Sequence, residues 1–220
     1  MDTTNQEQET LIDQQASQGL HLEEGLFVRV ARAFQKISPQ FGWPILLLFL
    51  VGPEAMRGSK SESFPIYLLL GTFPVLGGLV LRFWARGFSR ADGFVLDGPY
   101  RYVRNPVELG SMAAYLGFGI VLGLSMPYLT FALIVAFVFL SFTSKAYERD
   151  ILIKVGGPYL RYARRVRRWI PSSLPGSNRS ARTYSIFHAL KFEKETLLWF
   201  ILYLVVFAVR QNLFFKNPLI

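Results

Sequence analysis

The chain has 220 residues, of which 51% are hydrophobic and 15% aromatic while only 18% are charged, and its mean hydropathy is positive. This composition is too apolar for an ordinary soluble domain of this size and indicates a membrane protein. Cysteine is absent and the only histidines are His21 and His188, which argues against disulfide scaffolds, cysteine nucleophiles and a bound metal. The net charge of +9 is compatible with nucleic acid, but cytoplasmic loops of a membrane protein are the simpler source.

The first part of the chain is polar and then becomes amphipathic. Residues 1–19 are rich in glutamine and lack apolar periodicity, so we expect a disordered tail. Between residues 20 and 38, apolar side chains recur every three or four positions, whereas Arg29, Arg32 and Lys36 share another face. This pattern predicts a basic amphipathic helix, which either lies on the membrane surface or packs on the protein's own loops.

Apolar segments that can enter the membrane follow, at residues 41–51, 64–81, 107–122, 127–143 and 196–209. The first is short of the ~20 residues that a full crossing needs, so it must borrow from its flanks, tilt or re-enter. Pro74 in the second predicts a kink or close helix packing. The expected fold is an all-α, polytopic membrane bundle of about five spans. Its N-terminal spans lie in residues 39–91, and residues 172–220 add a linker and an extra span.

The third and fourth apolar segments are joined by the short uncharged link 123–126, which predicts an antiparallel hairpin. A hairpin returns the chain to the side where it started, so polar block one (residues 82–106) and polar block two (residues 144–171) share one membrane face. Both blocks are rich in arginine and lysine, whereas the loop 52–63 is not. By the positive-inside tendency both blocks are cytoplasmic, and we expect an inner-membrane protein whose pocket faces the cytoplasm.

Block two contains a strongly basic run, Arg164-Arg165-Val166-Arg167-Arg168-Trp169. It suits an anionic lipid surface with the tryptophan at the level of the headgroups, or it serves as a topological anchor without a specific ligand. Membrane lipids are therefore the expected partners, and the excess positive charge requires no nucleic acid.

Block one ends in a stretch whose chemistry exceeds the needs of a simple connector. Pro99 and Pro106 rigidify the backbone, while Gly98 and Gly110 allow close approach of another group. Pro106 biases the preceding residue away from helical geometry, which predicts that a helix begins there. A helix N-terminus offers unpaired N–H groups to anionic ligand groups. Glu108, in the first turn, is either a functional carboxylate or simply a favourable charge at that helix end.

Glu148 lies where an apolar segment of block two meets the membrane interface, and an unpaired carboxylate there would be costly. Lys145 and Arg149 are close to it in sequence and offer a local ion pair. The other possibility is that Glu148 binds a cationic cofactor group in a pocket lined by aromatic residues such as Tyr159 and Tyr162.

The two blocks share an ordered pattern: Gly98-x-Tyr100-x-x-x-Arg104-Asn105-Pro106-x-x-x-Gly110, the apolar hairpin, Glu148 with Leu152, Gly156, Tyr159-x-x-Tyr162 and Ile170-Pro171. This pattern resembles the integral-membrane methyltransferases, namely the isoprenylcysteine carboxyl methyltransferase and phospholipid methyltransferase families. The resemblance covers residues 92–171, which we take as the methyltransferase core, and it implies S-adenosylmethionine as the cofactor.

The resemblance also implies roles for particular residues of this chain. The expected catalytic group is Arg104, Asn105, Glu108 and Glu148. The expected cofactor-binding group is Phe94, Val95, Tyr100, Asn105, Pro106, Val107, Glu108, Glu148, Tyr159 and Tyr162. A substrate-contacting arginine of the family falls on Ser144, with Lys145 beside it.

Several family positions are occupied differently here. Asn105 replaces a histidine, Glu108 a tyrosine, Arg149 a second glutamate and Gly156 a phenylalanine. The missing arginine at Ser144 argues against isoprenylcysteine as the acceptor. The leading hypothesis is methyl transfer from S-adenosylmethionine to a lipidic or membrane-associated small acceptor. The alternatives are an NADPH-dependent reductase of the sterol-reductase type and a non-catalytic membrane protein on the same scaffold.

Overall fold

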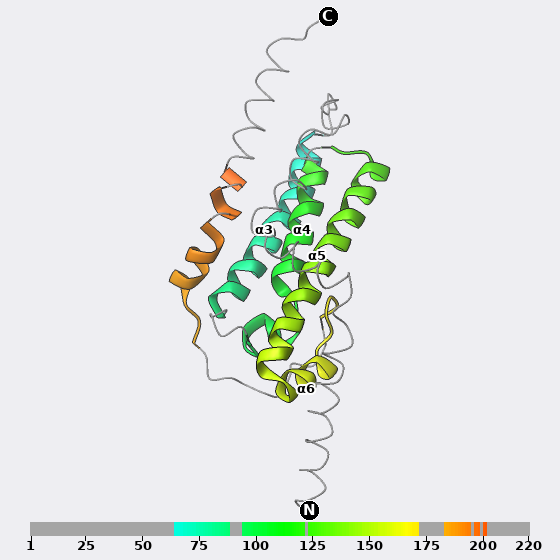
Figure 1. Cartoon of the computed structure of the whole chain (residues 1–220). Coiled ribbons are helices and arrows are strands. Elements are labelled where there is room, and N and C mark those ends of the chain that lie inside the picture. The colour runs from blue at the N-terminus through cyan, green and yellow to red at the C-terminus, as the bar shows by residue number, and fades with distance from the viewer. Residues whose placement is uncertain are drawn as a thin grey trace, which may run out of the picture.

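The computed structural model describes residues 64–88, 94–121, 123–171, 183–194, 196–198 and 200–201, and no strand occurs among them. Three long helices lie side by side in Figure 1: α3 (Phe64–Phe88), α4 (Pro106–Val121) and α5 (Met126–Val155). A short 3-10 helix, η2 (Gly98–Arg101), precedes α4, and α6 (Gly157–Arg165) follows α5. The described residues therefore confirm the all-α class.

Parts of the prediction lie outside the described residues. They are the disordered tail, the amphipathic helix at 20–38, the short first apolar segment and most of the last one. Of the described helices, Ile66–Phe88 and α5 are long and apolar enough to cross a membrane, whereas α4, with 16 residues, is shorter. Large apolar side chains such as Phe73 and Phe131 are exposed on the outer faces of α3 and α5, as lipid contact requires.

Glycines allow α3 and α4 to approach each other closely. Gly71 faces Gly117, and a Cβ atom added at Gly71 would lie 2.5 Å from the Gly117 carbonyl oxygen. About two helical turns further along α3, Gly78 faces Gly110. A Cβ atom added at Gly110 would lie 2.6 Å from the Gly78 carbonyl oxygen. Helices without a hydrophobic driving force between them associate through such small-residue contacts. The close packing predicted around Pro74 is thus present between these two helices.

The antiparallel hairpin of α4 and α5 is also confirmed. Gly123 has φ +64° in the turn, and the Leu124 amide donates to the Gly119 carbonyl at 3.1 Å. Beyond the turn, Phe118 of α4 belongs to a buried cluster that includes Ala132 and Ala136 of α5. The alanines are fully buried in this cluster, and the hairpin brings α5 back to the level where α4 begins.

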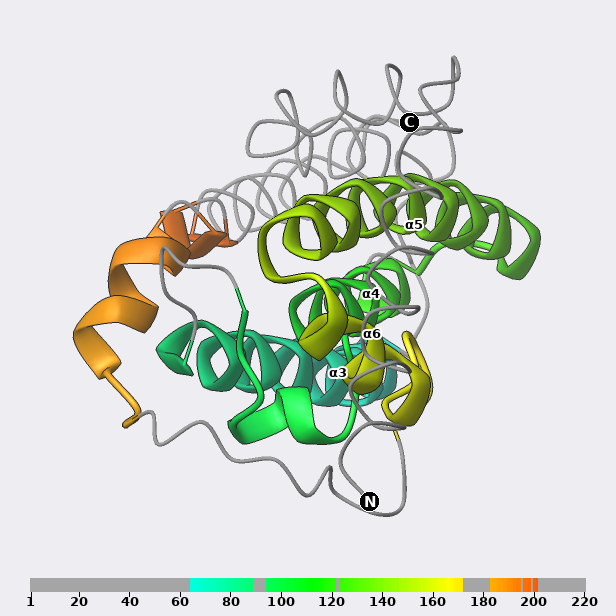
Figure 2. The same cartoon turned by 60° about the horizontal axis from the view of Figure 1, so that its bottom comes forward.

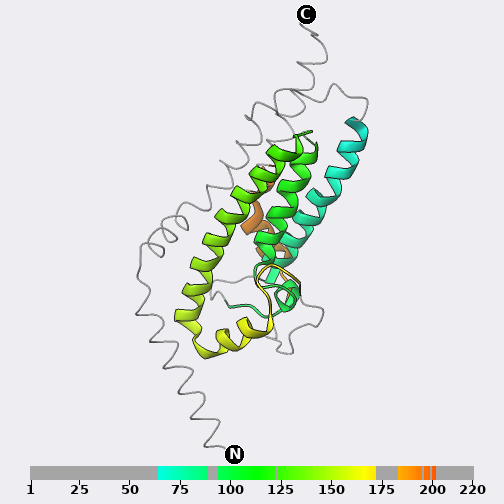
Figure 3. The ribbon, with the colours of Figure 1, turned by 90° about the vertical axis from the view of Figure 1, so that its right-hand side faces the viewer.

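Two helices extend further than the apolar runs predict. α3 ends at Phe88 rather than Leu81, so the part of block one that carries Arg82 and Arg86 is helical. α5 ends at Val155 rather than Thr143, and its 30 residues are about 45 Å long, more than the ~30 Å of a hydrocarbon core. Figure 3 shows the end of α5 projecting past α4 to meet α6. The hydropathy pattern identifies where the apolar environment ends, not where the helix ends.

A C-terminal stretch, residues 183–201, packs beside α3 and α4 (orange in Figure 1). The Ser185 amide donates to the Gly87 carbonyl at 3.0 Å, and the Phe200 ring lies 5.7 Å from the ring of Phe118. Tyr184 contacts the Phe88 ring edge-on at 5.5 Å. This stretch is therefore part of the described bundle.

Candidate functional site

The two polar blocks meet at one end of the bundle, which Figure 2 views from that end. The Arg104 amide donates to the Arg167 carbonyl at 2.9 Å, and the Tyr162 hydroxyl donates to the Tyr100 carbonyl at 2.8 Å. These bonds join residues about sixty positions apart in the chain. The prediction that the hairpin places both blocks on one side is confirmed.

The local structure of block one follows from its glycine and prolines. Gly98 has φ +60°, a conformation that glycine adopts without strain, and an added Cβ would collide with the Phe88 ring. Pro99 lies at the start of η2, and Pro106 begins α4, where its missing N–H costs no helical hydrogen bond. The Leu109 amide donates to the Asn105 carbonyl at 3.0 Å. The predicted helix start is confirmed, with Glu108 in the first turn.

Glu148 is the centre of a buried polar group that we call the Glu148 cluster: Arg104, Asn105, Glu148 and Arg168. Glu148 Oε1 accepts hydrogen bonds from Asn105 Nδ2 at 2.9 Å and Arg168 Nε at 2.9 Å. Its Oε2 accepts from Arg104 Nη1 at 2.9 Å and Arg168 Nη2 at 2.8 Å. The arrangement joins block one, α5 and the segment after α6 through one carboxylate.

These four bonds fill the acceptor capacity of the carboxylate. Glu148 forms ion pairs with Arg104 and Arg168, which come from distant parts of the chain. Arg168 makes a bidentate contact, and its hydrogen bonds to Glu148 raise the pKa of its guanidinium. A ligand could reach Glu148 directly only by displacing one of these donors, so the geometry favours a role in holding the site together.

Aromatic side chains lie against the Glu148 cluster. The Phe94 ring meets Tyr159 and Tyr162 edge-on, with centroids 5.8 and 5.7 Å away, and Val95 is buried beside this region. Burial raises the pKa of Tyr159 and Tyr162 above the usual value for tyrosine, so both hydroxyls stay protonated near neutral pH. In this state the Tyr162 hydroxyl donates to the Tyr100 carbonyl, and the Tyr159 hydroxyl also carries a proton that it can donate.

Two buried polar atoms of this region have no hydrogen-bond partner in the described part of the chain, the Tyr159 hydroxyl and Arg104 Nε. The charges of Arg104 and Glu148 act on the pKa of Tyr159, yet neither side chain makes a well-formed hydrogen bond with its hydroxyl. A buried polar group without a partner is costly, which makes these atoms natural contacts for a ligand.

The remaining residues with predicted roles fall into two sets. Tyr100, Pro106, Val107 and Glu108 lie at the start of α4 and in η2, beside the Glu148 cluster. Ser144 is fully buried and its hydroxyl donates to the Leu140 carbonyl at 2.7 Å, whereas Lys145 is exposed. A substrate contact of Ser144 and Lys145 stays a prediction.

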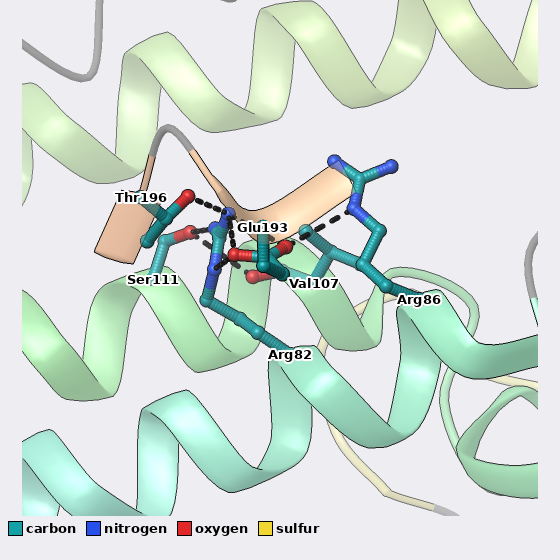
Figure 4. A network of polar contacts seen from close by, with 6 residues as sticks. All are labelled: Arg82, Arg86, Val107, Ser111, Glu193 and Thr196. Carbon is teal, nitrogen blue, oxygen red and sulfur yellow. Dashed lines mark hydrogen bonds and ion pairs between the residues drawn. The ribbon is translucent and has the colours of Figure 1, made fainter. Parts of the chain in front are cut away.

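A second polar group was not expected from the sequence, and we call it the Glu193 cluster: Arg82, Arg86, Ser111, Glu193 and Thr196 (Figure 4). The Glu193 side chain is fully buried, and Arg82 holds it through Nε and Nη2, both at 3.0 Å. Arg82 also donates to Ser111 and Thr196, and Ser111 donates to the Val107 carbonyl at 3.0 Å. Arg86 contributes a single bond, Nε to Glu193 at 3.2 Å.

The sequence held a signal for this cluster. Arg82 and Arg86 are one helical turn apart and follow an apolar run directly, so both need a partner at the membrane boundary. Nothing in the sequence indicated which of the distant acids would serve, because residue 193 is more than one hundred positions away.

Residues 68–157 match the family model described as phospholipid methyltransferase. The match confirms the resemblance read from the sequence, and it includes Arg104, Asn105, Glu108 and Glu148. No curated protein and no solved structure matches the chain. The matched segment is less than half of the chain, and it includes most of the two described helices that are long and apolar enough to cross a membrane. Arg168 and the Glu193 cluster's C-terminal members lie beyond the matched residues.

Proposed function

We propose that the protein is an integral-membrane methyltransferase that uses S-adenosylmethionine to methylate a lipidic or membrane-associated small acceptor. The observation that carries the proposal is the meeting of Arg104 and Asn105 with Glu148 inside the segment that matches the phospholipid methyltransferase family. Two parts of a family motif that are 43 and 44 residues apart in sequence form one hydrogen-bonded unit.

The residues around this unit fit the cofactor. Phe94, Tyr159 and Tyr162 supply aromatic surface for an adenine ring or a sulfonium cation, and Tyr159 adds a buried hydroxyl without a partner. The Arg104 Nε is a second such donor. These features support a binding site of mixed aromatic and polar character, of the kind that small cofactors use.

S-adenosylmethionine supplies a methyl group already activated by its sulfonium sulfur. Held by the aromatic and polar residues around Glu148, it would act as the methyl donor in a direct displacement by the acceptor, which would leave S-adenosylhomocysteine and release one proton. Such a displacement chiefly requires alignment and a dry site, without a covalent enzyme intermediate. The buried side chains around Glu148 meet the second requirement.

We assign Glu148 a structural role, in which it holds the parts of the site together. Its ion pairs with Arg104 and Arg168 fix the residues before α4 against the segment after α6. The aromatic residues of both parts are thereby held beside each other. The basic character of both blocks further supports a cytoplasmic position for the site, where a soluble cofactor is available and a lipid acceptor can arrive from the membrane.

Calorimetry on the purified protein in detergent tests the proposal. We expect S-adenosylhomocysteine to bind and NADPH not to bind. NADPH binding alone would favour the reductase alternative, and failure of both ligands would contradict every enzymatic hypothesis. Tyr159→Phe should weaken S-adenosylhomocysteine binding about threefold to tenfold, the value of one hydrogen bond. Tyr67→Phe, at an exposed position on α3, is the matched control and should have no effect.

Alkaline phosphatase fusions test the cytoplasmic position. Alkaline phosphatase becomes active only outside the cytoplasm. A fusion at residue 174 should therefore be inactive, and a fusion at residue 58 should be active. The reverse result would invert the proposed orientation.

A further inference from the structure

Glu108 lies between the two polar clusters on one strip of α4. Asn105, Glu108 and Ser111 follow one another at three-residue spacing, which places them on neighbouring turns of the same side. Asn105 binds Glu148, and Ser111 binds Arg82 of the Glu193 cluster. Glu108 is therefore flanked by both clusters, but its carboxylate forms no ion pair with any described residue.

Arg86 carries the opposite charge, and the two terminal nitrogens of its guanidinium have no described partner. Its Nε is fixed on Glu193, and in Figure 4 both terminal nitrogens point away from that carboxylate. Neither makes a hydrogen bond to a described residue, and the side chain is 32% exposed. The guanidinium lies 5.8 Å from the centroid of the Phe192 ring, which leaves the edge open.

The free groups of Arg86 and Glu108 face one neighbourhood. Arg82 meets Ser111 across the antiparallel helices α3 and α4, so Arg86, one turn later on α3, and Glu108, one turn earlier on α4, lie at the same level. Arg86 and Glu108 nevertheless do not form an ion pair. Arg86 still has two terminal nitrogens without a described partner, and Glu108 forms no ion pair with a described residue, so together they offer contacts to a ligand that carries both charges.

We propose that Arg86 and Glu108 form a binding site for a zwitterionic group, with Arg86 taking its carboxylate or phosphate and Glu108 taking its ammonium group. The inference rests on the proposed function and makes it more specific. Two molecules share this chemistry: the amino-acid end of S-adenosylmethionine and a phosphoethanolamine headgroup. Arginine binds both carboxylate and phosphate through paired N–H groups, so the side chain suits either source.

Glu193 is the positioning residue of this site. It neutralises Arg82, which uses its remaining donors on Ser111 and Thr196, and it holds Arg86 by one nitrogen only. Two arginines share one carboxylate, so a positive charge remains in excess at Arg86. Because Glu193 lies outside residues 68–157, the C-terminal stretch completes a site whose other members belong to the family-matched segment.

Three ligands separate the possible sources by calorimetry in detergent. S-adenosylhomocysteine carries the amino-acid zwitterion, and 5′-methylthioadenosine has the same nucleoside and sulfur without it. Short-chain phosphatidylethanolamine carries the headgroup zwitterion. We expect Arg86→Gln and Glu108→Gln to lower the affinity for one of the two zwitterionic ligands about tenfold to a hundredfold. The affinity for 5′-methylthioadenosine should stay unchanged. Arg161→Gln, an exposed arginine on α6, should change none of them.

The pattern of losses decides the assignment. Loss of S-adenosylhomocysteine alone identifies the cofactor's amino-acid end, and loss of the lipid alone identifies the headgroup. If both variants bind both zwitterions as tightly as the parent, the inference is wrong even though the proposed function stands. If the parent binds none of the three ligands, the proposed function fails as well.

Conservative variants separate binding from folding. Arg86→Lys and Glu108→Asp keep their charges and should retain more of the zwitterion affinity than the glutamine variants do. Glu193→Gln should lower zwitterion affinity and leave the affinity for 5′-methylthioadenosine unchanged, because it releases Arg86 without touching the nucleoside. Equal losses for all three ligands in Glu193→Gln would show a purely structural role and would contradict the positioning role.

Discussion

Replacing Glu148 by glutamine should destabilise the protein strongly. The substitution keeps the shape of the side chain but removes its charge and replaces one acceptor oxygen with a donor. Arg104 and Arg168 would then face each other without a counter-charge, and at least two of the four hydrogen bonds would be lost. The two blocks of the site would lose their main polar link.

The size of the effect follows from burial. The side chains of Glu148, Arg104 and Arg168 are 9%, 17% and 28% exposed, so the cluster is mostly shielded from solvent. Removing one partner of a buried ion pair costs about 3–5 kcal/mol, whereas an exposed pair is worth about 1 kcal/mol or less. The partial exposure of Arg168 places the expected loss near the lower value, ~3 kcal/mol. For a chain of this length that lowers the unfolding midpoint by about 6–12 °C.

Thermal unfolding in detergent, followed by circular dichroism, measures this change. Lys154→Gln, an exposed charge change on the same helix, should shift the midpoint by only about 1 °C. Adding Arg168→Gln to Glu148→Gln should recover part of the loss, because it removes one of the two uncompensated charges. A Glu148→Gln midpoint equal to that of the Lys154→Gln control would refute the view that Glu148 holds the blocks together.

Two further predictions concern helix packing and pH. Gly78→Ala should cost about 1–3 kcal/mol, because its Cβ would lie 2.9 Å from the Ala114 amide nitrogen on α4. Gly77→Ala, with nothing within 4 Å of its Cβ, should be neutral or stabilising by up to about 1 kcal/mol, and equal midpoints for both variants would contradict the glycine contact. Burial raises the folded-state pKa of Tyr159 and Tyr162. The contribution of the two tyrosines to the free energy of unfolding is therefore complete below about pH 10 and is lost as the pH rises further. The Tyr159→Phe/Tyr162→Phe double variant should therefore show a flatter decline of unfolding midpoint above that pH than the parent, and an unchanged slope would contradict the assignment.

Local patterns predicted much of the bundle. The proline at position 106 marked the start of α4, and the uncharged link before Met126 marked the turn of the hairpin. From the hairpin alone it followed that the residues around Asn105 and Glu148 share one end, and the hydrogen bond between them bears this out. These features depend on backbone stereochemistry and on the length of apolar segments, both of which a single sequence contains.

The pairing of charges could not be predicted in the same way. The basic run that contains Arg168 predicts an anionic lipid contact or a topological anchor, yet this arginine turns inward to Glu148 while Arg164 and Arg167 remain exposed. Likewise, the apolar run of the second segment predicts a helix end near Leu81, whereas Arg82 and Arg86 extend α3 beyond it. Which acid a given arginine meets depends on tertiary packing across many residues, and hydropathy carries no information about it.

The way each carboxylate is satisfied separates structural acids from a ligand-binding acid. Glu148 and Glu193 are each held by two arginines, so their charges are compensated by the protein itself and neither needs the charge of a ligand. Glu108 differs because it lies between them on α4 and forms no ion pair within the described residues. A carboxylate kept near a membrane boundary without a protein partner is costly unless a ligand supplies the missing charge. Glu108 stands where the resemblance implies a tyrosine, and this added carboxylate supports the proposed zwitterion site because the charge of a ligand would offset its cost.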